Sequence, residues 1–272
     1  MFGILAALAF VLALSGPAQA QELADRWIDV TDPVLQPAAP HVIARHYKLW
    51  DGRPNCGPGE TARLVLAFHG GLGSANKMAT EYLTAPVLDR CYVIAYPSGS
   101  NKGLGGVIRV SGDFLLWNIA APALDAGWPN AAGVNDDLFI ASLVASLKAS
   151  HGLNTAFAVG VSLGGMLAFH QACDTANFNA LATVATTIAD PTCDIAYHIP
   201  DLHIHGTADT DVCWALTGAQ CDPWPRARPL VLDYQAQDGP HARQIVSGGV
   251  HAWDMGNGYD TTGNIWAWLD GR

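Results

Sequence analysis

Positive charge is scarce in this sequence. Lysine and arginine together supply 14 of the 272 residues, against 24 aspartates and glutamates, so the formal net charge is -10. A chain this acidic lacks the basic surface that nucleic-acid phosphates and anionic membranes attract. We therefore expect no nucleic acid and no anionic membrane surface among its partners. A neutral or sugar-linked substrate fits this charge better than a strongly anionic polymer.

The sequence also lacks internal repeats, low-complexity tracts and a long Pro/Ser linker that would divide it. Half of its residues are hydrophobic and 14% are charged, which is typical of a packed globular chain rather than a disordered one. The length beyond the N-terminal segment suits one domain with a full core, or two small ones at most. We expect a single domain over residues 21–272, acting as a monomer.

The first 20 residues contain no lysine or arginine, so the terminal amine alone supplies positive charge there. An apolar run over 4–14 is followed by a Ser-Gly-Pro breaker and an Ala-x-Ala sequence over 18–20. This pattern predicts a signal peptide over residues 1–20, and the run is shorter than the ~20 residues that span a bilayer. We expect a secreted or periplasmic protein that begins near Gln21 and keeps no membrane anchor after cleavage.

No two cysteines have the Cys-x-x-Cys spacing that is common in metal sites. There are six cysteines, and an even number in an exported chain predicts disulfides. Other pairings stay open, but proximity along the chain favours three pairs: Cys213 with Cys221, Cys173 with Cys193, and Cys56 with Cys91.

Short apolar runs alternate with helical patterns along the rest of the chain. Strands are predicted at 41–49, 64–68, 92–96, 156–159, 181–188, 202–204 and 244–246, and helices at 77–88, 136–148, 165–172 and 264–269. The alternation implies the α/β class, with a mostly parallel sheet covered by helices on both faces. Ligand sites in such sheets gather at the carboxyl ends of the strands.

The segment Gly160-Val161-Ser162-Leu163-Gly164 lies between a predicted strand and a predicted helix. A serine between two glycines in this context is typical of the sharp turn that exposes the nucleophile of the α/β-hydrolase fold. Residues without a Cβ at 160 and 164 relieve the crowding of such a turn, and the helix N-terminus favours developing negative charge. The flanking elements favour this interpretation over a plain Gly/Ser turn.

A serine nucleophile needs a base and an acid that orients the base, and in this fold they follow in the order Ser, Asp or Glu, His. Asp209 follows a predicted strand and a Gly turn and is the expected acid, with Asp211 as the alternative. His251 lies in a Gly-rich loop before the last helix and is the expected base. The competing His241 precedes a strand, at the wrong end of the sheet.

Stabilisation of an oxyanion requires two N–H donors. We expect one from Leu163 and the other from Gly70 or Gly71, in the glycine-rich loop after an early strand. A phosphate cradle is the rival interpretation of that loop, but no Gly-Lys-Ser/Thr follows it. His203 and His205 have no nearby carboxylate or thiol partners in the sequence and are expected in a core or turn role. Residues 254–260 are expected to form a plain loop, with a weak calcium site as the alternative. We expect no metal and no cofactor.

The chain has nine tryptophans, several of them in predicted loops. Their rings could stack on sugar, phenolic or polyester groups, although any one of them could equally pack on the core. Trp117 and Trp253 are the two that we expect near the site as substrate-binding residues, together with Asn118. The loops over 98–134 and 210–228 are expected to set specificity.

Together these segments resemble the secreted esterases grouped as polyhydroxybutyrate depolymerase-like or feruloyl esterase-like α/β-hydrolases. The matching pieces run from about residue 42 to the end: His69-Gly70-Gly71, Tyr96-Pro97-Ser98-Gly99, Trp117-Asn118, Asn135-Asp136-Asp137, Gly160 to Met166, His205 to Asp209, and Gly249 to Trp253. The resemblance implies a serine carboxylesterase with Ser162, Asp209 and His251 as catalytic residues. The family commonly has Asn after the serine, where this chain has Leu163, which implies a change in the pocket lining.

Polymer-degrading relatives in that family usually carry a linker and a binding domain. Neither is present in this sequence, so the resemblance implies soluble or oligomeric esters, of hydroxyalkanoates or of plant-wall acids, as the substrate. A catalytically silent carbohydrate- or polyester-binding protein on the same fold is the alternative. A peptidase or a lipase is a third hypothesis, and the lack of a long hydrophobic lid segment argues against the lipase.

Overall fold

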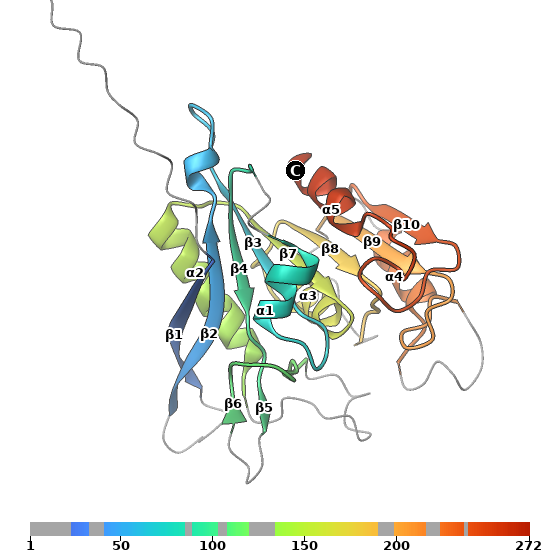
Figure 1. Ribbon diagram of the computed structural model, residues 1–272, viewed down its shortest axis with the longest axis horizontal. Helices are drawn as coiled ribbons and strands as arrows, with labels where there is room; N and C mark the ends of the chain where they lie inside the picture. The colour runs from blue at the N-terminus through green and yellow to red at the C-terminus, as the bar shows by residue number, and fades with distance from the viewer. Residues whose placement is uncertain are drawn as a thin grey trace, which may run out of the picture.

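The computed structural model describes residues 23–32, 41–84, 89–102, 108–119, 134–189, 199–215, 224–236 and 239–272. The predicted signal peptide lies outside these residues. Eight strands form one sheet, and two short strands form another (Figure 1). In spatial order the large sheet contains β1 (Ala24–Asp32), β2 (His41–Asp51), β4 (Tyr92–Pro97), β3 (Arg63–Phe68), β7 (Ala156–Val161), β8 (Ala180–Val184), β9 (Asp201–Gly206) and β10 (Ala242–Val246). The small sheet pairs β5 (Asn101–Lys102) with β6 (Ile108–Arg109).

The large sheet is parallel from β4 to β10, and its two remaining pairs, β1 with β2 and β2 with β4, are antiparallel. The predicted mostly parallel sheet is therefore confirmed. The edge strand β1 was not predicted from the sequence. Its run carries Asp25, Arg26 and Asp29, so hydrophobic alternation is weak, and the strand is defined by its pairing with β2.

Helices cover both faces of this sheet. They are α1 (Ala75–Lys77), which continues as the π-helix η2 (Met78–Tyr82), α2 (Asp136–His151), α3 (Leu163–Asp174), α4 (Ala227–Gln235) and α5 (Thr261–Asp270), besides the 3-10 turn η1 (Arg53–Asn55). Along β3, Leu64, Leu66 and Phe68 pack with α2, α3 and α4. Val65 and Ala67, which alternate with them, pack with α1, η2 and α5. The period of two along β3 thus separates two cores, one on each side of the sheet.

Local signals account for the ends of these helices. The Asn135 side chain accepts a hydrogen bond from the Leu138 N–H at the start of α2, and Gly152 ends that helix in the left-handed conformation at φ 68°. The segment predicted as a helix over 77–88 is an α-helical turn followed by a π-helix that ends at Tyr82. Residues 85–88 are outside the described residues. The strand predicted over 181–188 ends at Val184.

Cys56 and Cys91 form a disulfide, as predicted. Cys173 and Cys213 each take part in a disulfide as well. Cys193 and Cys221, their predicted partners, lie outside the described residues, so those two pairings stay predictions.

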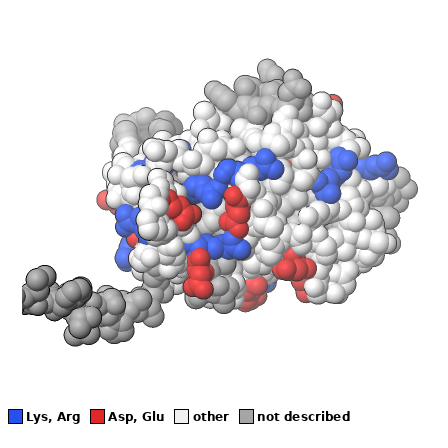
Figure 2. Space-filling model, turned by 90° about the horizontal axis from the view of Figure 1, so that it is seen from above, with Lys and Arg blue, Asp and Glu red and all other residues white. Residues whose placement is uncertain are grey.

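Charged side chains of both signs are interspersed on the face shown in Figure 2, where the coloured atoms form no continuous basic patch. Within the described ranges no helix has the length and apolarity needed to cross a bilayer. No group of three His, Cys, Asp or Glu side chains in the same ranges could hold a metal ion.

Candidate active site

Ser162 sits on a strained turn between β7 and α3. Its backbone has φ 53° and ψ -123°, a conformation that side-chain-bearing residues rarely adopt. A Cβ on Gly160 would lie 2.3 Å from the carbonyl oxygen of Gly164. A Cβ on Gly164 would lie 2.4 Å from the carbonyl oxygens of Phe68 and His69. Glycine at both positions is therefore what allows the chain to hold Ser162 in this turn.

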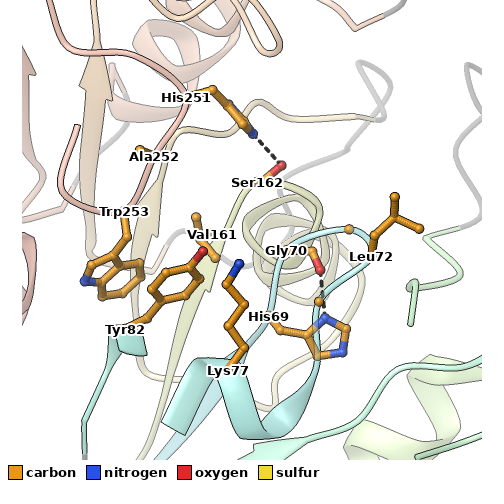
Figure 3. Close-up of a pocket in the computed structure, with 12 residues that line it drawn as sticks. His69, Gly70, Leu72, Lys77, Tyr82, Val161, Ser162, His251, Ala252 and Trp253 are labelled. Atoms are coloured by element: carbon orange, nitrogen blue, oxygen red, sulfur yellow. Dashed lines mark hydrogen bonds between the residues drawn. The ribbon is translucent and has the colours of Figure 1, made fainter. Parts of the chain in front are cut away.

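Ser162, His251 and Asp209 form a continuous hydrogen-bonded series (Figure 3). The Nε2 atom of His251 lies 2.9 Å from the Ser162 hydroxyl oxygen, and Nδ1 lies 2.8 Å from an oxygen of Asp209. Because a carboxylate can only accept a hydrogen bond, Nδ1 carries the proton. Nε2 then accepts a hydrogen bond from the Ser162 hydroxyl. The three residues follow β7, β10 and β9, so they meet where the carboxyl ends of parallel strands bring them together.

Asp209 is fully buried and accepts hydrogen bonds at both oxygens. One oxygen accepts from the backbone N–H groups of Asp211 and Val212, each at 2.9 Å. The other accepts from His251 and lies 3.4 Å from Nε2 of His205. Burial alone would raise the pKa of Asp209, but the hydrogen bonds from His205 and His251 outweigh it and lower the pKa to about 2. The carboxylate is thus held ionised opposite the imidazole.

Two buried histidines, His205 and His203, continue the hydrogen-bonded series beyond Asp209. His205 donates from Nε2 to the Val212 carbonyl at 2.7 Å, so its Nδ1 accepts from Nε2 of His203 at 3.0 Å. The remaining nitrogen of His203 then accepts from the Thr183 hydroxyl at 2.9 Å. Burial lowers the pKa of His203, which agrees with a neutral ring at that position. Both histidines lie in the core, as expected, but the contact of His205 with Asp209 was missed. The only signal for it was the spacing of four residues between His205 and Asp209.

The two alternatives considered for the acid and the base lie elsewhere. Asp211 is exposed and approaches Asp209 through its backbone N–H. His241 is paired with Asp201 at 2.6 Å, where β9 begins, at the opposite end of the sheet from Ser162. Among these candidates, the structure brings Asp209 and His251 to Ser162.

The loop after β3 lies against the turn that holds Ser162. A Cβ on Gly70 would lie 3.5 Å from Cβ of Ser162, and one on Gly71 would lie 3.5 Å from the Leu163 side chain. The backbone N–H groups of Leu163, Gly70 and Gly71 make no hydrogen bond to any residue that the structure describes. These donors are consequently available to an oxygen bound next to Ser162, and the choice between the two glycines stays open.

His69 fixes the conformation of this loop. Its Nδ1 donates to the Gly70 carbonyl at 2.7 Å, and its Nε2 accepts from the N–H of Gly99 at 3.0 Å. Burial lowers the pKa of His69 to about 4, so the ring is neutral and can serve in both roles. The sequence motif contains His69 but does not predict this positioning role.

Trp117 is not at the surface of the site. It is fully buried, packs against Phe68 and His69, and donates its indole N–H to the His69 carbonyl at 2.8 Å. The expectation that its ring stacks on substrate is therefore replaced by a supporting role, because no ring face is open. The sequence placed Trp117 in a loop but could not show that its indole would find an acceptor inside the core.

Asn118 likewise does not line the cavity at Ser162. Its backbone N–H donates to Asp136 at 2.7 Å and its side-chain amide donates to the Val134 carbonyl at 2.8 Å. Asp136 is fully buried and paired with the equally buried Arg45 at 2.6 Å. Burial raises the pKa of Asp136 and the Arg45 charge opposes that rise. Asn118 thus ties the Trp117 segment to α2 and β2 instead of contacting a ligand.

A cavity of about 150 Å³ opens beside Ser162 and His251 (Figure 3). Its wall includes Trp253, as the sequence predicted, and also Leu72, Lys77 and Tyr82, which were missed. The Trp253 ring stacks on Tyr82 with centroids 5.3 Å apart and planes 10° apart. No motif marks Lys77 and Tyr82, which read in sequence as part of an ordinary helix.

An eight-stranded, mostly parallel sheet with a strained serine turn after a central strand is the α/β-hydrolase fold, which confirms the expected fold class. No protein-family model and no curated protein matches the sequence. Solved structures do match, at low identity. Esterase PE8 has a TM-score of 0.55 and 19% identity, over 78% of this chain and 94% of its own.

Two further structures extend the comparison. An S-formylglutathione hydrolase from Agrobacterium tumefaciens has a TM-score of 0.61 and 12% identity, over 93% of this chain and 98% of its own. A puromycin-hydrolyzing peptidase of Mycobacterium tuberculosis has a TM-score of 0.57 and 15% identity, over 95% of this chain but 41% of its own. Similarity at these identities establishes the fold, which is shared by hydrolases of several substrates.

Proposed function

We propose that this protein is a serine carboxylesterase that works through an acyl-enzyme. Ser162 is the nucleophile, His251 the general base and then acid, and Asp209 the residue that orients and stabilises the imidazolium. The observation that carries the proposal is the unbroken series of 2.9 Å and 2.8 Å hydrogen bonds ending on a serine in a strained turn. A hydroxyl is a weak nucleophile without such a partner.

In the first half of the reaction the Ser162 oxygen attacks the ester carbonyl and its proton passes to Nε2 of His251. The carbonyl oxygen becomes an oxyanion, which the N–H of Leu163 and that of Gly70 or Gly71 stabilise. As the tetrahedral intermediate collapses, the alcohol leaves with the proton from His251 and an acyl-serine remains. Water then attacks the acyl group by the same route, which releases the acid and restores the serine.

The ester bond is favoured over the amide by two considerations. The sequence resembles polyhydroxybutyrate depolymerase-like and feruloyl esterase-like enzymes, and the structural neighbours include esterases. A cavity of about 150 Å³ suits a small or oligomeric ester better than a bulky chain. We propose a hydroxyalkanoate or plant-wall ester as the substrate, with no cofactor. Export as a single-domain monomer is part of the proposal, and the disulfide between Cys56 and Cys91 supports an oxidising compartment.

Labelling with a fluorophosphonate tests this proposal, because only an activated serine reacts. We expect one adduct on Ser162 in the protein beginning at Gln21 and none in Ser162→Ala. Hydrolysis rates for p-nitrophenyl acetate, methyl ferulate, acetylated xylan and 3-hydroxybutyrate oligomers then identify the substrate class. A protein that neither reacts nor hydrolyses any of these esters would be a binding protein on this fold, and the proposal would be wrong.

A further inference from the structure

Lys77 places a positive charge in the cavity wall without a counter-charge. It is one of four lysines in a chain of net charge -10. The cavity that it shares with Ser162 and His251 is lined by twelve residues, none of which is Asp or Glu. Its ammonium forms no ion pair with any carboxylate of the described residues, and Glu81 acts on it only at longer range. An unpaired cation beside a proposed nucleophile is a feature that a neutral substrate would not require.

The wall around Lys77 is built from fixed side chains. The ammonium lies 5.5 Å from the centroid of the Tyr82 ring, and that ring is stacked on Trp253. Thr262 ties both aromatic residues together, because its hydroxyl accepts from the Trp253 indole at 2.9 Å and donates to the Tyr82 carbonyl at 3.0 Å. The backbone of Lys77 is held by the Ser74 cap at 3.2 Å.

The charge of Lys77 is also maintained. A hydrogen bond with Tyr82 raises the pKa of Lys77, so the ammonium persists through the neutral range. The Lys77 ammonium and the Tyr82 hydroxyl therefore present two donors on the same side of the cavity that Ser162 lines (Figure 3). A carboxylate is a small group that can accept from both and neutralise the charge, and it occurs in many esters of small acids.

We propose that Lys77 and Tyr82 form a subsite for a carboxylate on the substrate, so that the preferred esters carry a free acid group on the acyl or the alcohol side. Half-esters of dicarboxylic acids and short hydroxy-acid oligomers have this chemistry. The net negative charge of the chain repels anions at long range, so the preference arises from short-range contact inside the cavity. This inference rests on the proposed esterase function for its catalytic readout.

Two matched pairs of esters separate the two sides of the substrate. Monomethyl succinate against methyl butyrate places the carboxylate on the acyl side, and 4-acetoxybutanoate against butyl acetate places it on the alcohol side. We expect kcat/KM to favour the anionic member of one pair by about tenfold or more, as for hydrogen bonds to charged groups. Lys77→Met should remove most of that ratio and Lys77→Arg should keep part of it. Lys148→Met removes the same charge from α2, outside the cavity, and should preserve the ratio.

A binding measurement makes the test independent of turnover. In the Ser162→Ala variant, titration calorimetry should show tighter binding of monomethyl succinate or 4-acetoxybutanoate than of its neutral partner, with the difference lost when Lys77→Met is added. Equal affinities, or an anionic preference that survives Lys77→Met, would overturn the subsite. Hydrolysis of neutral esters without that preference would do the same while leaving the esterase proposal standing. Anion binding without hydrolysis of any ester would overturn the esterase proposal and support the subsite.

Discussion

Two hydrogen-bonded sets of serine, histidine and aspartate lie among the residues that the structure describes, and their hydrogen-bond distances are nearly equal. Besides the series at Ser162, the Ser98 hydroxyl lies 2.8 Å from Nδ1 of His46, and Nε2 of His46 lies 2.9 Å from Asp25. Ser98 directly follows β4, much as Ser162 follows β7. The second set borders a cavity of about 480 Å³, larger than the one at Ser162. Residue types, distances and cavity size therefore do not distinguish the two sets.

The backbone and the surroundings do distinguish them. Ser98 is 1% exposed, its N–H donates to the His46 carbonyl, and its own carbonyl accepts from Arg45. Ser162 instead lies on a positive-φ turn at the start of α3, with available N–H donors beside it. Under the proposed function, the turn and the N–H donors around Ser162, and not the hydrogen-bonded trio alone, would make that serine reactive.

The acids differ as well. The Asp25 side chain is 61% exposed and also binds Lys48 at 2.9 Å, and hydrogen bonds from Lys48 and then His46 lower its pKa. Asp209 is fully buried and surrounded by donors. Water screens the charge of Asp25, whereas the charge of Asp209 acts on the imidazole at close range in a medium of lower dielectric.

The largest expected difference is between the two serines. Ser162→Ala should lower kcat on a good ester by roughly 10⁴-fold or more, because the covalent route is lost. Ser98→Ala should keep kcat within about twofold, since Ser98 has neither the turn nor the donors. Steady-state kinetics on both purified variants, with circular dichroism to verify folding, measures this. Equal losses in the two variants would mean that the second set takes part in turnover.

The two aspartates should also differ in their effect on turnover. Asp209→Asn should lower kcat by about 10³-fold or more, because an amide no longer holds the imidazole in the tautomer that accepts the Ser162 proton. Asp25→Asn should leave kcat nearly unchanged. The check is kcat and KM for both variants on the same ester. A small loss at Asp209 would show that the buried carboxylate is not the partner that His251 requires.

The same two aspartates should differ in the pH dependence of stability. The folded-state pKa of Asp209 is about 2, below its unfolded value near 3.9, so its ionisation stabilises the fold above about pH 4. That stabilisation is lost as the pH falls toward 2. Urea unfolding from pH 5 to 2.5 should show the stability gap between wild type and Asp209→Asn narrowing. For Asp25→Asn the gap should stay small throughout, because water screens the interaction of this exposed carboxylate with Lys48 and His46.

Chain order and glycine placement were enough to predict that Ser162, Asp209 and His251 lie together, because the turn and the parallel sheet dictate where these residues meet. The second set was not predictable. Asp25 and His46 are brought together by the pairing of β1 with β2, a register that no local pattern specifies. Contacts between buried side chains of different elements were not predictable from the sequence either. The hydrogen bond of Trp117 to His69 is one example, and the lining of the cavity by Lys77 is another.

The smallest expected effect on turnover concerns His205 and Lys48, the side chains that contact the two aspartates. His205 is fully buried and lies 3.4 Å from Asp209, whereas Lys48 reaches Asp25 near the surface. His205→Gln should lower kcat by about tenfold with little change in KM, because Asp209 loses part of its fixed position while the cavity keeps its lining. Lys48→Met should change neither constant. If His205→Gln raised KM and left kcat intact, the histidine would be shaping the cavity instead of holding the acid. The contact of buried His205 with Asp209 would then not account for a difference in activity between the two sets.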